Sequence, residues 1–333
     1  MTLIAPNVDS GGSLRSGRMR ILIPFMNDAR LEQLHQSAPD VHFLMAHTET
    51  EALAMAAEID ASYAYCSSAL LKASPHLRWV QVASAGVESY PLQEIHARGI
   101  TFTNAKGIYG TQLADHTFAL ILAFNRQLPF LLRAQQKQIW ENRQNYPPGE
   151  LAGQTLLIVG LGGAGLETAR RAKGFGLRIL ATRRHSHLPR PDFVDEIHPP
   201  DRLHHLLPEA DWVAVCVPLV PETLDLFHDD EFELMKRTAY IVCVTRGKII
   251  NTDALLRALE AGKIAGAGLD VTDPEPLPPS HPLWTKENVI ITPHASGHSP
   301  HADSRMFNLL CENVRRFASG QPLLNPVDLE LQY

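Results

Sequence analysis

The chain has 333 residues, of which 45% are hydrophobic and 20% charged, and its formal net charge is −6. These proportions are those of ordinary globular proteins, and the length favours two domains. The negative charge argues against nucleic-acid binding, which needs clustered Lys and Arg, and no run approaches the roughly 20 apolar residues of a membrane helix. Cys66, Cys216, Cys243 and Cys311 lie far apart without a C-x-x-C pair, which argues against a zinc site or disulfide framework and favours a cytoplasmic protein.

The first half of the chain alternates short apolar runs with helical patterns. Residues 1–18 are rich in Ser, Gly and Asn and lack the apolar core of a signal peptide, so we expect a disordered leader. Strands that alternate with helices predict parallel βαβ units in an α/β fold. The predicted strands are 20–24, 41–44, 62–66 and 79–82, with helices at 30–36 and 50–57 among those between them.

The second half begins with a long helical stretch, 112–124 and 127–140, in which Pro129 predicts a break or a kink. A second α/β run follows, and its six predicted strands are the number in a complete dinucleotide-binding sheet. A last helix is predicted at 302–317. The six strands are 155–159, 177–181, 212–217, 239–244, 265–269 and 289–292.

A glycine-rich motif follows the first of these six strands. Residues 160–165 read Gly-Leu-Gly-Gly-Ala-Gly and open a helical segment before the next strand, which is the setting of a dinucleotide-binding turn. Gly160 permits the tight turn, Gly162 lets the backbone approach the pyrophosphate, and Gly165 allows the helix to pack closely on the strand. The pyrophosphate would lie at the helix N-terminus, where free N–H groups favour anions. Gly163 and Ala164 belong to the same expected site.

The end of the next strand indicates the type of cofactor. NAD sites usually carry Asp or Glu there to hold the ribose 2′-hydroxyl, but residues 181–184 read Ala-Thr-Arg-Arg. Arg183 and Arg184 can bind a phosphate through paired N–H groups. NADP is therefore the expected cofactor. NAD remains the alternative, in which both arginines are solvated loop residues.

Three further polar segments follow predicted strands at their carboxyl ends, where doubly wound sheets bind ligands. They carry Arg246, Glu275 and His294. A planar Arg binds a carboxylate and polarises a carbonyl, a His exchanges the hydroxyl proton, and a carboxylate beside that His fixes its ring. Each residue alone is weak support, since a loop Arg is usually just solvated. In this order after a dinucleotide motif, they predict hydride transfer on a 2-oxo acid.

From residue 19 to residue 326 the chain resembles the D-isomer-specific 2-hydroxyacid dehydrogenase family. The matching stretches are 81–87, 103–107, 113–116, 160–165, 216–219 with 221–223, 235–236, 245–247, 269–271 with 274–276, and 292–294. The resemblance implies a Rossmann-type doubly wound parallel sheet plus a second, flavodoxin-like α/β substrate domain. The substrate domain would be split, 19–108 with 297–333, around a dinucleotide-binding domain at 109–296. It also implies a homodimer through residues 110–140.

The resemblance implies roles for individual residues. Arg246 would bind the substrate carboxylate and carbonyl oxygen, His294 would be the acid/base with Glu275 as its partner, and Asp270 would meet the nicotinamide end of the cofactor. The substrate would be held by Arg246 and His294 together with a substrate loop. This loop consists of Ser84, Ala85, Gly86 and Val87. Further cofactor-binding residues besides Arg246 and His294 would be Cys216, Val217, Pro218, Thr223, Val244 and Thr245.

Two positions refine the expected substrate and cofactor. Arg183 stands where NAD-using members carry Asp. Glu275 is retained where formate dehydrogenases of this superfamily carry Gln, which counts against formate. The substrate loop is most similar to that of glyoxylate/hydroxypyruvate reductases, so a short 2-oxo acid is the expected substrate.

Two other readings compete with this one. His294, His298 and His301 could suggest a metal site, but Gly297 and Pro300 interrupt any helix and the segment holds no carboxylate, so we expect no metal. A non-catalytic, NAD(P)-sensing corepressor-like protein on the same fold is the alternative function, because fold alone does not define activity.

Overall fold

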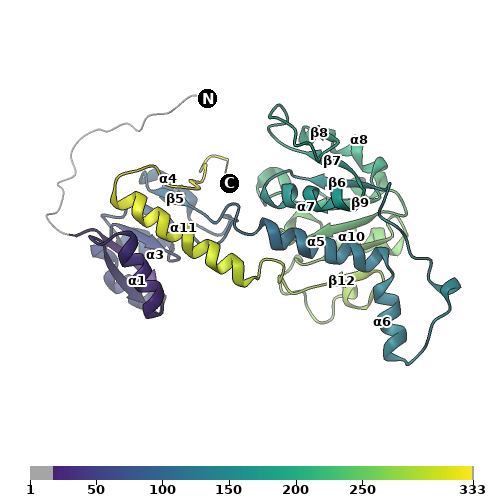
Figure 1. The fold of residues 1–333 in the computed structure, drawn as a ribbon, viewed down its shortest axis with the longest axis horizontal. Helices are drawn as coiled ribbons and strands as arrows, with labels where there is room; N and C mark the ends of the chain where they lie inside the picture. Colours follow the sequence, from purple (N-terminus) through teal and green to yellow (C-terminus); the bar gives the residue numbers. More distant parts are fainter. Residues whose placement is uncertain (1–17, 332–333) are drawn as a thin grey trace.

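The computed structural model describes residues 18–331, so the predicted leader lies outside the described residues except for Arg18. Figure 1 shows two lobes joined by the chain near α5 and near the start of α11. The first lobe carries β1–β5 and α11, and the second carries β6–β12 and α5–α10. Each lobe is built on its own parallel sheet.

The sheet of the first lobe has the strand order β2-β1-β3-β4-β5, the order of flavodoxin-like folds. The prediction of a flavodoxin-like second sheet is therefore confirmed. The pattern predicts no strand at β5, because three residues, of which two are buried, show no alternation. The strands are β1 (Arg20–Pro24), β2 (His42–Ala46), β3 (Ala61–Tyr63), β4 (Trp79–Gln81) and β5 (Thr101–Thr103). The helices between them are α1 (Asp28–Ser37), α2 (Glu49–Met55), α3 (Ser68–Ala73) and α4 (Leu92–Ala97).

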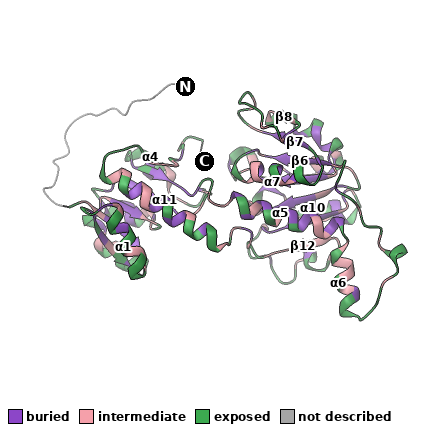
Figure 2. Cartoon of the chain, in the orientation of Figure 1, coloured by how far each residue is buried: buried purple, intermediate pink, exposed green. Residues whose placement is uncertain are grey.

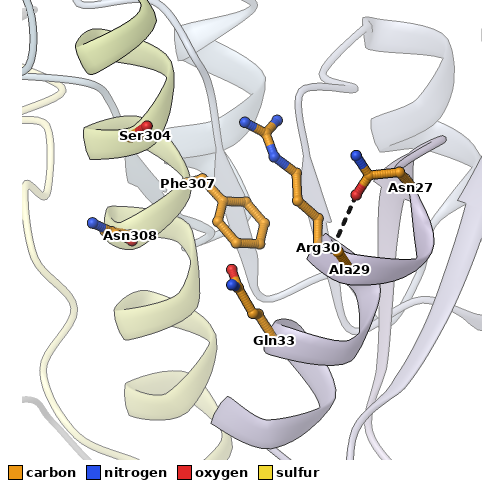
Figure 3. Close-up of a pocket in the computed structure, with 7 residues that line it drawn as sticks. All are labelled: Asn27, Ala29, Arg30, Gln33, Ser304, Phe307 and Asn308. Carbon is orange, nitrogen blue, oxygen red and sulfur yellow. Dashed lines mark hydrogen bonds between the residues drawn. The ribbon is translucent and has the colours of Figure 1, made fainter.

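The helix α11 (Pro300–Ala318) returns from the second lobe to the first, where it lies beside α1. Its apolar face buries Phe307, Leu310 and Val314 against the strand β1. Figure 3 shows Phe307 facing Arg30 of α1 across a shallow hollow, with the guanidinium carbon 5.0 Å from the ring centroid. The predicted division into 19–108 with 297–333 and 109–296 stays a prediction.

The sheet of the second lobe has the order β12-β11-β10-β9-β6-β7-β8, all parallel. This is the Rossmann order 3-2-1-4-5-6 extended by β12. The prediction of six strands was wrong, since the sheet has seven within residues 18–331. The strand that the pattern missed is the edge strand Glu196–His198, which is too short and too polar to show a period. The strands are β6 (Thr155–Val159), β7 (Arg178–Thr182), β8 (Glu196–His198), β9 (Trp212–Val215), β10 (Tyr240–Cys243), β11 (Gly266–Leu269) and β12 (Val289–Ile291).

Both faces of this sheet are covered, as parallel sheets require. The strands β6 and β9 are buried along their whole length, and the core divides into one cluster on each face. Figure 2 shows these buried strands between exposed outer helix faces. The helices are α5 (Gly110–Asn125), α6 (Leu128–Gln136), α7 (Gly163–Gly174), α8 (Leu203–Leu206), α9 (Asp229–Leu234) and α10 (Thr252–Glu260).

The predicted break at Pro129 is confirmed. The helix α5 ends at Asn125, Gln127 takes a left-handed φ of 56°, and Pro129 lies in the first turn of α6. The predicted continuation to Trp140 is wrong, because α6 ends at Gln136 and the chain leaves as an extended arm. Between residues 18 and 331 no helix is both long and apolar enough to cross a membrane.

Candidate active site

The glycine turn after β6 has the shape that a dinucleotide needs. Gly160 has a φ of 99°, which favours glycine, and a Cβ there would lie 2.7 Å from Val217 Cγ1. A Cβ on Gly165 would overlap the carbonyl oxygen of Gly160, so the helix α7 packs directly on the turn. A Cβ on Gly162 would meet no atom within 4 Å. The N-terminus of α7 is therefore open at Gly162, where a pyrophosphate can reach its free N–H groups.

Arg183 and Arg184 lie at the end of β7, beside this turn. The hydroxyl of Thr182 accepts from the N–H of Gly160 at 3.2 Å, which ties the strand end to the turn. Arg183 donates through Nη2 to the carbonyl of Leu188, while its Nε is buried and finds no acceptor among the described residues. Because an unmet buried donor is costly, this Nε fits a site that takes a bound acceptor. Arg184 Nη2 is 3.8 Å from a carboxylate oxygen of Glu222.

The other predicted cofactor residues lie at neighbouring strand ends. Cys216, Val217 and Pro218 follow β9, which pairs with β6, and Val244 and Thr245 follow β10, which pairs with β9. Burial raises the pKa of the Cys216 thiol to about 12, so it is not a nucleophile. Thr223 shapes the loop after β9, since its hydroxyl donates to the carbonyl of Pro218 at 2.6 Å.

His294 and Glu275 form a hydrogen-bonded pair beyond the ends of β11 and β12. Nδ1 of His294 lies 2.7 Å from Oε1 of Glu275, and both side chains are about two-fifths exposed (43% and 42%). Nε2 of the ring is thus left for a ligand. His294 itself has a φ of 51°, an unusual value for a residue other than glycine. Such strain at a non-glycine residue is typical of functional sites.

The carboxylate of Asp270 holds the loop that carries His294. It is fully buried and accepts hydrogen bonds from the hydroxyl of Thr292 at 2.6 Å and from the N–H groups of Ala295 and Ser296 at 2.9 Å. Burial alone would raise the pKa of Asp270, but the hydrogen bonds, that of Ser296 first, outweigh it and lower this pKa. The ring of His116, from α5, closes the network at 2.9 Å from Thr292 Oγ1. Asp270 therefore acts on His294 from beneath, a use that the sequence pattern does not reveal.

The substrate loop 84–87 follows β4 in the first lobe. Its carbonyl groups are tied down: Asn104 Nδ2 donates to Ala85 O at 2.7 Å, and Ser84 Oγ donates to Gly86 O at 2.8 Å. The N–H groups of Ala85, Gly86 and Val87 donate to no acceptor within the part of the chain that the structure describes. Three such donors fit an anion such as a carboxylate.

Arg246, after β10, reaches across to this loop from the second lobe. A Cβ on Gly86 would overlap the guanidinium, so a larger residue there requires the side chain of Arg246 to move. Over residues 18–331, Arg246 hydrogen-bonds Glu88 and the carbonyl of Thr245 but neither His294 nor Glu275. Glu88 is a site residue that the sequence reasoning missed; its one signal was an acidic residue directly after the substrate loop.

A doubly wound sheet with an open glycine turn, and a His–carboxylate pair at neighbouring strand ends, define an NAD(P)-dependent oxidoreductase. Residues 118–296 match the model of the D-isomer specific 2-hydroxyacid dehydrogenase, NAD binding domain. The chain belongs to the D-isomer-specific 2-hydroxyacid dehydrogenase family.

Individual relatives agree with this assignment. The chain is 38% identical over 269 residues to a glyoxylate reductase of Korarchaeum cryptofilum, and the alignment covers 79% of each protein. It superimposes on a D-isomer specific 2-hydroxyacid dehydrogenase family protein from Aeromonas salmonicida with a TM-score of 0.81 and 32% identity, covering 94% of this chain and 100% of that one. A D-isomer specific 2-hydroxyacid dehydrogenase from Xanthobacter autotrophicus in complex with NADPH and MES gives a TM-score of 0.78 at 25% identity, over 94% and 99% of the two chains. The predicted family, fold class and enzyme class are confirmed.

Proposed function

We propose that the protein is an NADPH-preferring reductase of short 2-oxo acids, with glyoxylate or hydroxypyruvate as substrate. The observation that carries the proposal is the hydrogen-bonded pair of His294 and Glu275, which lies at the same carboxyl edge of the sheet as the open glycine turn. Relatives that bear the name glyoxylate reductase support the substrate class. A non-catalytic sensor is not favoured, because a relative 38% identical to this chain bears the name of an enzyme, glyoxylate reductase.

When bound, NADPH supplies the hydride that reaches the carbonyl carbon. Glu275 accepts from Nδ1 of His294, which fixes the ring and leaves Nε2 to give a proton to the carbonyl oxygen. Arg246 binds the substrate carboxylate, and the N–H groups of residues 85–87 bind it from the first lobe. In the reverse direction the neutral ring takes the hydroxyl proton.

The preference for NADPH rests on the end of β7. Arg183 and Arg184 follow the strand, residues 181–184 include no Asp or Glu, and Nε of Arg183 is buried without an acceptor among residues 18–331. Charge-assisted hydrogen bonds to a phosphate are stronger than neutral ones. The NADPH of the Xanthobacter relative is in keeping with this choice. The pyrophosphate would be bound by the turn of residues 160–165.

We also propose a homodimer through residues 110–140. The helix α6 exposes Leu132, at 55% of its surface, and the arm after α6 exposes Ile139 at 50% and Trp140 at 100%. Covering them with a second copy would remove this apolar surface from water. A cytoplasmic location is proposed with it, supported by four free thiols.

Steady-state kinetics test the function. Glyoxylate, hydroxypyruvate, pyruvate and a bulky aromatic 2-oxo acid are each assayed with NADPH and with NADH. We expect the highest kcat/KM for glyoxylate or hydroxypyruvate with NADPH, roughly ten- to a hundredfold above NADH. Turnover of bulky 2-oxo acids alone, or a clear preference for NADH, contradicts the corresponding part of the proposal.

A further inference from the structure

The side chain of Glu88 spans the two lobes and binds the arginine proposed to hold the substrate. Its Oε1 accepts from Nε of Arg246 at 2.5 Å, and 30% and 29% of the two side chains' surfaces are exposed. Glu88 directly follows the substrate loop, while Arg246 follows β10 of the other lobe. The chain thus places a carboxylate of its own on the proposed carboxylate-binding residue.

This carboxylate lies against the substrate loop as well as against Arg246. A Cβ built on Gly86 would lie 2.5 Å from Oε2 of Glu88 and would also overlap the guanidinium of Arg246. The carboxylate of Glu88 therefore lies beside both groups proposed to hold the substrate, the loop backbone and Arg246. Nη1 of Arg246 donates to the carbonyl of Thr245 at 2.8 Å and Nε donates to Glu88, so the N–H groups of Nη2 remain for a ligand. A second carboxylate cannot take the Nε edge while Glu88 occupies it.

We propose that Glu88 is an internal competitor for the substrate carboxylate at Arg246, and that it sets the affinity of the enzyme for 2-oxo acids. The inference rests on the proposed function. A binding-competent site exists only in the fraction of molecules in which Arg246 is released, so the apparent affinity is lowered by that fraction. A ligand must bring its own carboxylate to replace the one it displaces. Compounds that lack a carboxylate would leave the Glu88–Arg246 pair intact.

Two substitutions at this position separate contact from charge. Glu88→Gln keeps the shape and removes the charge, and Glu88→Asp keeps the charge but shortens the reach to Arg246. The matched control is Glu94→Gln, because Glu94 lines the same surface hollow as Glu88 but pairs with Ser68 at 2.6 Å instead of Arg246. Each variant is assayed for the KM of glyoxylate, for kcat, and by calorimetry for the binding of oxamate, a carboxylate-bearing analogue, to the NADP⁺-loaded protein.

If Glu88 competes, Glu88→Gln lowers both the KM for glyoxylate and the Kd of oxamate by the same factor, roughly three- to tenfold, with kcat within about twofold of wild type. Glu88→Asp lowers both constants as well, and Glu94→Gln leaves them unchanged. Unchanged constants in Glu88→Gln overturn the proposal. So does a wild-type value in Glu88→Asp, which would mean that charge acts through space without contact.

A fall in kcat in Glu88→Gln, with KM unchanged or raised, also overturns it, since Glu88 would then orient Arg246 for the reaction. Failure of the proposed function looks different: wild type would reduce none of the 2-oxo acids. In that case the Kd of oxamate for the wild type and for Glu88→Gln would still show whether Glu88 competes with a carboxylate at Arg246.

Discussion

His294 Nδ1 lies 2.7 Å from Glu275 Oε1, and the loop beneath His294 is held by the buried carboxylate of Asp270. His294 is thus held at two points. Glu275 binds its ring nitrogen Nδ1, and the backbone carbonyl of Asp270 accepts from its backbone N–H at 2.8 Å. Orientation from both sides is what a proton donor needs, because transfer requires hydrogen-bond geometry before it requires acidity.

Substitutions in this pair should lower turnover and spare cofactor binding. His294→Ala removes the proton donor, so we expect kcat for glyoxylate reduction to fall by about 10²- to 10⁴-fold. Glu275→Gln keeps the shape but replaces the carboxylate that accepts from Nδ1 of His294 by a neutral amide, which holds the ring less firmly, so a smaller fall of about ten- to a hundredfold is expected. Steady-state kinetics and NADPH fluorescence titrations measure the two effects. Loss of NADPH binding in His294→Ala would argue that this residue is structural.

Two glycines of the turn should separate folding from cofactor binding. The Cβ of Gly165→Ala would overlap the carbonyl oxygen of Gly160, so we expect a loss of about 1–3 kcal/mol or more of unfolding free energy. Gly162→Ala meets no protein atom within 4 Å and should melt like wild type, yet bind NADPH more weakly, because its methyl group lies where the pyrophosphate approaches. Thermal melts with and without NADPH test both. Equal NADPH affinities in wild type and Gly162→Ala would contradict the placement of the pyrophosphate.

Asp270 should make stability depend on pH in the acid range. Burial raises its pKa, but hydrogen bonds from Ser296 and Thr292 outweigh that effect and the pKa is lowered. A carboxylate whose pKa is lower in the folded state than its unfolded value of about 3.9 stabilises the protein above that pH, and this contribution is lost as the pH falls through the folded pKa. Asp270→Asn should therefore lower the unfolding free energy by about 1–3 kcal/mol at pH 7. On acidification the variant should lose less unfolding free energy than the wild type does.

Urea unfolding of wild type and Asp270→Asn at pH 7, 5, 4 and 3 measures this dependence, provided that both variants unfold reversibly. The difference between the two proteins should narrow below about pH 4. A difference that stays constant over the series would mean that the carboxylate of Asp270 contributes through its shape and not through its charge.

The arginines after β7 should set the choice of cofactor. Arg183→Ala with Arg184→Ala removes the proposed phosphate contacts, so we expect kcat/KM with NADPH to fall roughly ten- to a hundredfold while kcat/KM with NADH changes little. Arg170→Ala is the control, since Arg170 lies on α7 with its side chain over Phe193. An equal loss with both cofactors would place the arginines outside the phosphate site.

The arm after α6 should control the oligomeric state. Trp140→Glu places a charge on the most exposed apolar side chain of the arm, so sedimentation velocity should show a shift from dimer to monomer. Leu188→Glu is matched to it, because Leu188 is also exposed, at 47%, but lies in the loop between β7 and β8. A wild type that sediments as a monomer would contradict the proposed dimer directly.

Residues close together in the chain were sufficient to predict the glycine turn and its flanking strands. The requirement for glycine at residue 160 is set by its own φ of 99°, and hydrophobic runs mark β6 and β7 on either side. The order of Arg246, Glu275 and His294 along parallel strands predicted their common edge, because the carboxyl ends of parallel strands face the same side.

The contacts that define the site could not be read from the chain in the same way. Glu88 and Arg246 are separated by 158 residues and lie in different lobes, so their ion pair exists only because the lobes meet at Gly86. The edge strand β8 is too short to carry a period, and only pairing with β7 makes it a strand. The carboxylate of Asp270 accepts from the N–H groups of the His294 loop, and only the packed chain brings these donors to it, because a buried charge must be satisfied by hydrogen bonds.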